Sequence, residues 1–452
     1  MSQLAAEPEL FLREAARRGF SELEIVVSHV ERFRAEISGN TIKPVSAGSR
    51  TVYGLRGVIG RRVGGLSVSD LAVGVEDVLR DLERVVRNSP EDPHWPGFPP
   101  RIYRGNRAET YSREFDELGP EKAVELAGLI VEEALEEGRS VGADKTYVVN
   151  AYVELARINI RVVNTNGVDI LEKCSMFSSG GGVKSVYSGV ESTYHFSIGG
   201  RRVEENGLGE RVRQAVSHTR LFANPSTPES GVYELVLTPR VFGEVLTYVV
   251  APAVSGLNIL EGRSPLRGRV GLNVFDERIT IRDDPLLPLH YGSRSFDDEG
   301  VGVMAKTVFD KGVFKTPLTN YYVSRRLNTD ATGNGFRGVP GVSTTPLPTN
   351  LVVEGGSGGL EEFVRDVRRG VVVYSTIGGW MSNFVAGQVY FTVTHGLLVE
   401  SGSVKPVKSF VVAGSIFDWL GGKLVAVGSD SEANFNIVSP SIYVREAMVS
   451  GG

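Results

Sequence analysis

The chain has six histidines, the residues best suited to bind zinc or to act as general bases near neutral pH. They are His29, His94, His195, His218, His290 and His395. A zinc peptidase usually carries two His one turn apart on a helix, next to a Glu. No two of these His are that close in sequence, so no local zinc motif is present. A site assembled from distant His stays open as the less favoured alternative.

A second group with chemical potential is a run of five carboxylates within 17 residues: Asp283, Asp284, Asp297, Asp298 and Glu299. Hard cations prefer such oxygen clusters, but the spacing matches no calcium loop. Carboxylates beside Pro285 and Gly300 also cap turns and pair with arginines, here Arg282 or Arg294. We expect a structural turn network, and metal binding is the alternative.

Nucleophilic and phosphate-binding motifs are weaker still. The single cysteine, Cys174, falls in a predicted strand after a Glu-Lys pair, where a buried bystander thiol is favoured over a nucleophile. No Gly-x-Ser-x-Gly elbow occurs. The glycine-rich stretches 179–182 and 355–359 lack the Lys-Ser/Thr ending of a phosphate loop, so we interpret them as turns.

Composition limits the classes of protein. The 452 residues are 41% hydrophobic and 23% charged, with a net charge of -5, which is typical of a folded protein of two to four domains. One cysteine excludes an intramolecular disulfide and a multi-cysteine zinc site. There is no apolar run of ~18 residues and no signal-like N-terminus, so we expect a cytoplasmic protein with no membrane contact. The acidic balance argues against nucleic-acid binding.

The first half alternates helices and strands. Apolar periodicity predicts helices over 9–18, 71–86, 121–137 and 208–221, the second capped by Ser69 or Asp70 and the third ended by Gly138. Strands are predicted over 22–37, 145–154 and 156–163, with a pair over 50–63. Asn164 to Gly167 supplies the turn of a hairpin.

The second half is dominated by short strands and glycine turns. Helices are predicted at 239–250, 321–327, 359–369 and 416–420, and the proline-containing segment 222–230 is predicted to be a linker. The elements segregate rather than alternate regularly, which favours an α+β fold. We expect a mixed helical and antiparallel-strand region over 1–221 and a β-rich domain over 222–452.

The acidic run also carries a resemblance to a known family. Asp283-Asp284-Pro285, Gly292-Ser293-Arg294 and Phe296-Asp297-Asp298-Glu299-Gly300 resemble the central signature of the TldD/PmbA family. Ala331-Thr332-Gly333-Asn334 is similar to the family's Ser/Thr-Gly-Asn turn. Further similar segments follow in the same order, so the resemblance covers most of the chain and implies a TldD/PmbA-like fold.

The family has two branches, and the resemblance implies which one this is. The TldD branch carries His-Glu-x-x-x-His on a helix and a Cys ligand near the C-terminus. Thr238 and Pro239 resemble the start of that helix, and in this register Thr247 and Pro252 occupy the His positions and Tyr248 the Glu position. No Cys follows Cys174. The chain therefore resembles the PmbA (TldE) branch, with no metal ligands and no catalytic residues of its own.

The resemblance implies a function as well. We expect a non-metal subunit of a TldD-type zinc metalloprotease complex that acts on unfolded or small peptides, with zinc in the partner chain only. A homodimer of the isolated chain is possible. Two alternatives stay open: an independent hydrolase with a metal site at 283–299, and a modulator of DNA gyrase, which is the older family label. The net charge of -5 argues against direct DNA contact.

Overall fold

Long antiparallel strands build the N-terminal half of the computed structural model, which describes residues 7–69, 74–102 and 104–452. The strand order is β4-β3-β1-β5-β6-β7, and β2 pairs with β1. The strands are β1 (Glu22–Ser38), β2 (Thr41–Ile42), β3 (Ser46–Ile59), β4 (Arg62–Val68), β5 (Lys145–Asn164), β6 (Asp169–Tyr187) and β7 (Val190–Gly200). Rich in Val, Ile and Tyr, they bury one face over most of their length.

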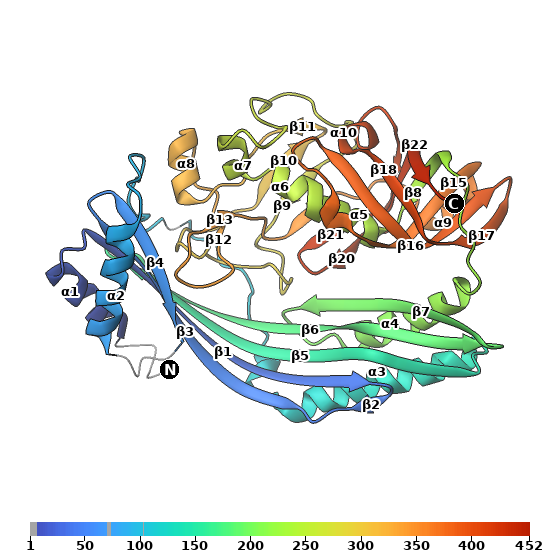
Figure 1. Cartoon of the computed structure of the whole chain (residues 1–452), viewed down its shortest axis with the longest axis horizontal. Helices are drawn as coiled ribbons and strands as arrows, with labels where there is room; N and C mark the ends of the chain where they lie inside the picture. The colour runs from blue at the N-terminus through green and yellow to red at the C-terminus, as the bar shows by residue number, and fades with distance from the viewer. Residues whose placement is uncertain (1–6, 70–73, 103) are drawn as a thin grey trace.

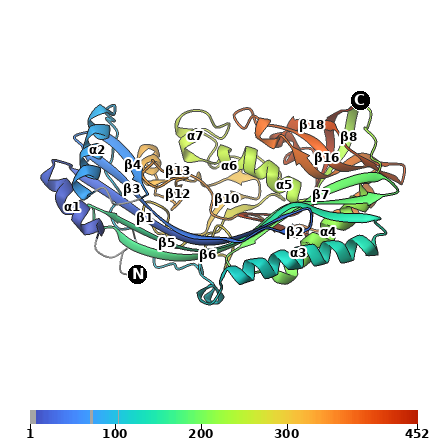
Figure 2. The same cartoon turned by 60° about the horizontal axis from the view of Figure 1, so that its bottom comes forward.

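Helices cover this sheet at two places (Figure 1). They are α1 (Glu7–Arg17), α2 (Val75–Asn88), α3 (Pro120–Ser140) and α4 (Glu205–Leu221), with the 3₁₀ turn η1 (Arg113–Asp116) before α3. The first two pack on β1 and β3 through Phe11, Leu79 and Leu82. The other two run side by side beneath the opposite end of the sheet (Figure 2).

The C-terminal half is built from short strands. One sheet has the order β15-β8-β22-β18-β16-β17, and β15 also pairs with β16, which closes five of its strands into a ring. Its strands, including β19 on β22, are β8 (Gly231–Leu237), β15 (Arg369–Ile377), β16 (Gln388–Glu400), β17 (Ser403–Val407), β18 (Phe410–Ser415), β19 (Leu424–Val427) and β22 (Ile442–Ser450).

A second C-terminal sheet has the order β11-β10-β9-β14-β21-β20, and β12 pairs with β13. These strands are β9 (Ile281–Asp283), β10 (Lys306–Asp310), β11 (Val313–Phe314), β12 (Gly335–Phe336), β13 (Thr345–Pro346), β14 (Leu351–Val353), β20 (Glu432–Asn434) and β21 (Ile437–Ser439). The helical segments are α5 (Pro239–Val245), the π-helix η2 (Leu246–Val250), α6 (Ala251–Ala253), α7 (Gly256–Leu260), α8 (Tyr321–Leu327), α9 (Leu360–Asp366), the 3₁₀ turn η3 (Gly379–Met381) and α10 (Ile416–Trp419).

One hydrophobic cluster joins the two halves. Ile130 of α3 and Val212 of α4 share it with Val372 of β15, Leu397 of β16 and Tyr443 of β22, all of them buried. Burial of apolar side chains from both halves in one cluster stabilises their contact. The halves therefore meet through a core as well as through polar groups.

The α+β class is confirmed, since almost all strand pairs are antiparallel and the helices flank them. Several predicted boundaries are wrong. Residues 145–163 lie in one strand, β5. Gly138 does not end α3; it packs against Thr146, and the helix continues to Ser140. The helix predicted from Leu71 begins at Val75 with Gly74 at its N-cap, so Ser69 does not cap it, and Asp70 and Leu71 lie outside the described residues.

Among the described residues, every helix is too short or too polar to cross a membrane.

Candidate functional site

The three positions that resemble the family's zinc helix lie on one irregular helix. It runs through α5, η2 and α6, and its middle turn is widened to π geometry. Pro252 has no N–H to donate to the preceding turn, which is a local reason for the widening. The side chain of Thr247 donates to the Gly243 carbonyl at 2.9 Å. Tyr248 is 38% exposed.

These side chains do not fit a zinc ion. Zinc in proteins takes Cys sulfur, His nitrogen or carboxylate oxygen. The ring of Pro252 offers no ligand atom, and the Thr247 hydroxyl is already bonded to the helix backbone. No His lies between His218 and His290 to occupy a neighbouring turn. This helix therefore lacks the chemistry of a zinc site.

The acidic run forms a buried hydrogen-bond network, beginning at Asp283 in β9. Its carboxylate accepts from Lys306 Nζ at 2.8 Å and from Asn334 Nδ2 at 2.6 Å, and the Thr349 backbone N–H and hydroxyl each donate to it at 2.7 Å. Lys306 also donates to Asn334. Asp284 accepts from the Leu286 N–H at 2.9 Å. With four donors in place, the Asp283 carboxylate has no free lone-pair direction for a cation.

The carboxylates in the second part of the acidic run, like Asp283, accept hydrogen bonds from several donors. Asp297 accepts from the N–H groups of Glu299, Val301 and Gly335 at 2.9–3.0 Å. Burial raises the pKa of Asp297 well above its ordinary value, and the nearby Glu299 carboxylate raises it further. Glu299 accepts from the Tyr321 N–H and the Thr344 hydroxyl.

Arginines complete this network and tie the two halves together. Arg294 contacts Asp298 at 3.1 Å and also pairs with Glu172 of β6. The expected pairing with Arg282 is wrong, because that exposed side chain pairs with Glu354. The carboxylates thus form the structural network expected from the sequence.

Glu24 of β1 forms a buried ion pair between the two halves. It accepts from Arg56 of β3 at 2.8 and 3.0 Å and from Arg337 of the C-terminal half at 2.9 Å. Burial acts to raise the pKa of Glu24, but the two guanidinium groups outweigh it and lower the pKa to about 2.

Two signature glycines have backbone angles that require glycine. Gly300 has φ +78° and Gly333 has φ +72°. A Cβ at Gly300 would lie 2.4 Å from Val168 Cγ1 of the N-terminal half. Gly333 precedes Asn334 and lets the chain turn that amide into the Asp283 network.

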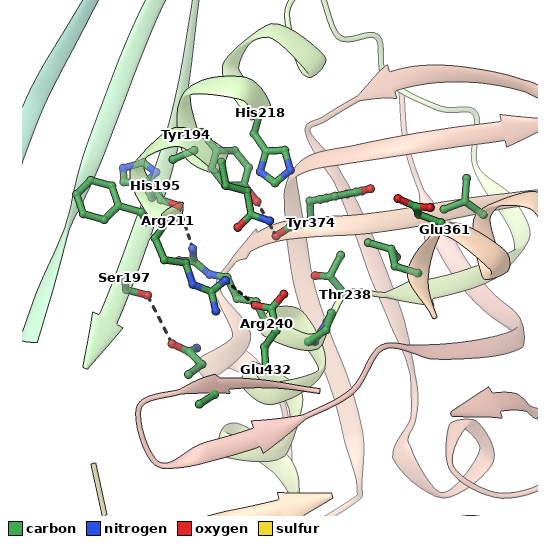
Figure 3. A pocket seen from close by; sticks show the side chains of 18 of the residues that line it. Tyr194, His195, Ser197, Arg211, His218, Thr238, Arg240, Glu361, Tyr374 and Glu432 are labelled. Atoms are coloured by element: carbon green, nitrogen blue, oxygen red, sulfur yellow. Dashed lines mark hydrogen bonds and ion pairs between the residues drawn. The ribbon is translucent and has the colours of Figure 1, made fainter. Parts of the chain in front are cut away.

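A cavity of about 600 Å³ lies where the two halves meet, between β7 and β20, each the last strand of its sheet. Figure 3 shows side chains from α4, α5, β7 and β15 converging on it. Its lining comprises Tyr194, His195, Phe196, Ser197, Arg211, Gln214, Ala215, His218, Thr238, Pro239, Arg240, Leu360, Glu361, Val364, Arg365, Tyr374, Glu432, Ala433 and Asn434. The wall thus combines apolar and aromatic side chains with polar and charged ones.

Two histidines that are far apart in sequence, His218 and His395, contact one aromatic ring beside this cavity. His218 of α4 and His395 of β16 pack edge-on to the Tyr194 ring at 4.6 and 4.9 Å, and His195 is the next residue of β7. Burial lowers the pKa of His218 and of His395 to about 4, so both rings are neutral at pH 7. Sequence reasoning missed this grouping, because no periodicity links a helix and two strands from different sheets. Among the described residues, no three His, Cys, Asp or Glu side chains are placed to share a metal.

Polar atoms in the cavity wall are left without partners. Six buried side-chain nitrogen or oxygen atoms of the described residues have no hydrogen bond, and three belong to lining residues: His218 Nδ1, Thr238 Oγ1 and Arg240 Nε. Thr238 is the N-cap residue of α5, but its side chain makes no capping bond. Arg240 donates through Nη1 to the His195 carbonyl at 3.0 Å, and its Nε lies 3.8 Å from Glu244, too far for a hydrogen bond.

Cys174 and His29 both lie in the N-terminal sheet. Cys174 is 1% exposed in β6, and burial raises the pKa of its thiol. Burial therefore favours the protonated, unreactive form of this side chain. His29 bonds to Thr51 across the sheet. Residues 179–182 lie within β6, not in a loop, which corrects their interpretation as a turn.

The C-terminal half matches a known protein-family model. Residues 230–451 match the model of the PmbA/TldA metallopeptidase C-terminal domain. An uncharacterised protein of Methanocaldococcus jannaschii is 24% identical over 98% of this chain and 99% of its own length. A metalloprotease of Methanothermobacter thermautotrophicus is 25% identical over 61% of this chain and 62% of its own length. A metalloprotease PmbA homolog of Buchnera aphidicola is 26% identical over 47% of this chain and 46% of its own length.

Solved structures with the same fold cover the whole chain. TldE from Thermococcus kodakarensis superposes with a TM-score of 0.88 at 24% identity, over 99% of this chain and 100% of that one. A Thermotoga maritima protein described as a putative modulator of a DNA gyrase superposes with a TM-score of 0.84 at 22% identity, over 98% of this chain and 99% of that one. Fold and C-terminal domain together define a protein of the metallopeptidase-like class. The chain belongs to the PmbA/TldD family.

Proposed function

We propose that this chain is a PmbA/TldE-type subunit, without metal ligands of its own, of a TldD-type zinc metalloprotease complex. The observation that carries the proposal is the chemistry of the helix at 239–253, which holds Thr247, Tyr248 and Pro252, the residues that the resemblance aligns with the family's His-Glu-x-x-x-His. The surrounding C-terminal domain is of the metallopeptidase type. A chain with this domain and without its ligands fits the role of a partner that encloses another subunit's active site.

We further propose that the substrates are unfolded or small peptides and that residues 1–221 and 222–452 act as two domains. Sheet edges such as β7 and β20 can pair with an extended chain. The cluster shared by the two halves supports a fixed arrangement of these domains rather than free movement.

The test is co-expression with a family member that carries His-Glu-x-x-x-His. We expect a stable complex that cleaves unfolded peptides and that loses cleavage, but not assembly, when the partner's Glu is changed to Gln. Thr247→Ala in this chain is the matched control and should leave cleavage unchanged. A chain that stays separate from such a partner, or cleavage that depends on Thr247, would overturn the proposal.

The independent-hydrolase alternative is less well supported, because the carboxylates at 283–299 are held by Lys306, Arg294 and backbone donors. The gyrase alternative rests on the description of a structural relative. Retention on a DNA column at low salt, and its loss at higher salt, would favour it over the peptidase role.

A further inference from the structure

The cavity at the meeting of the two halves has the size of a small-molecule site. At about 600 Å³ it lies within the range of ligand pockets, which is roughly 300–1,000 Å³. Its wall combines Ala215, Leu360, Val364 and the Tyr374 ring with polar side chains from α4 and α5. A wall that combines apolar surface with polar groups can orient a ligand by one polar end.

The polar groups of the wall are matched to an anion. Arg240 is a permanent cation, the Thr238 hydroxyl can donate, and the neutral His218 ring can donate through Nδ1 in one tautomer. All three have a buried atom without a partner. Buried polar atoms of folded proteins are normally bonded, so three exceptions in one wall call for an explanation. A bound carboxylate would satisfy them after small rotations of these side chains.

The other charges of the cavity are arranged differently. Arg211 is neutralised by Glu432 at 2.6 Å. Glu361 and Arg365 are exposed at the rim, on α9. The buried Nε of Arg240 lies 3.8 Å from the Glu244 carboxylate and makes no hydrogen bond to it. Burial also raises the pKa of Glu244 above its ordinary value.

We propose that this cavity binds a carboxylate attached to an apolar or aromatic body, with Arg240, Thr238 and His218 holding the carboxylate and Tyr374, Leu360 and Val364 contacting the body. The chemistry is shared by two sources, a free organic acid and the C-terminal residue of a peptide. The site belongs to this chain alone and does not depend on a partner subunit, so it stands or falls separately from the proposed function.

The experiment is calorimetric titration of the purified full chain with three probes: 3-phenylpropanoate, acetyl-Ala-Phe with a free carboxylate, and acetyl-Ala-Phe amide. We expect saturable binding of at least one acid, and at least about tenfold weaker binding of the amide, because a hydrogen-bonded charge contributes about 1.5–3 kcal/mol. Binding of only 3-phenylpropanoate identifies a free acid as the source, and binding of the peptide acid identifies a peptide end.

Variants locate the site. Thr238→Val and Arg240→Gln should each weaken acid binding by about tenfold, and Ala433→Trp, which replaces an exposed lining residue of β20, should abolish it by filling the cavity. Arg282→Gln, an exposed arginine paired with Glu354, is the matched control and should bind as the unchanged chain does. Circular dichroism confirms that each variant is folded. The proposal is overturned if neither acid binds, if the amide binds equally well, or if Ala433→Trp binds as before.

Discussion

The acidic network and the cavity both lie where the two halves meet, but they differ in how completely their buried polar groups are hydrogen-bonded. In the network, Asp283 accepts four hydrogen bonds and Asp297 accepts three from backbone groups. In the cavity wall, Thr238, His218 and Arg240 each keep a buried atom without a partner. The saturated region resembles a structural support, whereas the unsaturated one resembles a binding site. Carboxylates in a row therefore do not by themselves indicate a metal site.

The largest effect is expected from Asp283→Ala. The change leaves Lys306 buried without its counter-charge, and breaking a buried pair from one side costs about 3–5 kcal/mol. Urea denaturation of the variant measures this loss. The control is Glu354→Ala, which breaks the exposed pair with Arg282 and should cost at most about 1 kcal/mol. Equal losses in the two variants would contradict the distinction between buried support and surface pair.

A slightly smaller effect is expected from Glu24→Gln, together with a change in pH dependence. The folded pKa of Glu24 is about 2 against an ordinary 4.5, so ionised Glu24 stabilises the fold above pH 4.5, and this stability is lost as the pH falls toward 2. The shift corresponds to about 3 kcal/mol. Denaturation at pH 7 and at pH 3 should show a smaller difference in the variant than in the unchanged chain. If the loss of stability from pH 7 to pH 3 were the same in the variant and the unchanged chain, Glu24 would not be the cause of that loss.

The histidines beside the cavity predict a second and smaller pH effect. The pKa of His218 and of His395 is about 4 in the folded chain against an ordinary 6.5, because burial opposes their charge. The unfolded chain binds these protons first, so stability falls as the pH drops from 6.5 to 4. The melting temperature of His218→Phe should fall less between pH 6.5 and pH 4 than that of the unchanged chain. An equal fall of the melting temperature in the variant and the unchanged chain would contradict a lowered pKa of His218.

The smallest effect comes from a matched pair of Thr→Val changes, one in each region. Thr349→Val removes a hydroxyl bonded to Asp283 and should cost about 1–2 kcal/mol. Thr238→Val removes a buried hydroxyl without a partner and should change the free energy of unfolding by no more than about 0.5 kcal/mol. Urea denaturation of both variants gives the comparison. A larger loss at Thr238 than at Thr349 would reverse the roles assigned to the two regions.

Sequence reasoning predicted what local pattern determines. The α+β class, the helix at 321–327 and the structural role of the carboxylates follow from periodicity, capping residues and adjacent arginines. The π-turn at Leu246–Val250 could not be predicted from propensities, because it depends on hydrogen-bond register along one helix. The cavity was missed for another reason: His218 and His395 meet at the Tyr194 ring only when β7, α4 and β16 pack.

The most direct measurement is the zinc content of this chain, purified alone and in complex with a His-Glu-x-x-x-His family member. We expect one zinc per complex, lost when the partner's two His are replaced, and no stoichiometric zinc in the isolated chain after dialysis against trace zinc. Stoichiometric zinc in the isolated chain would contradict the assignment of this protein as the subunit without metal ligands.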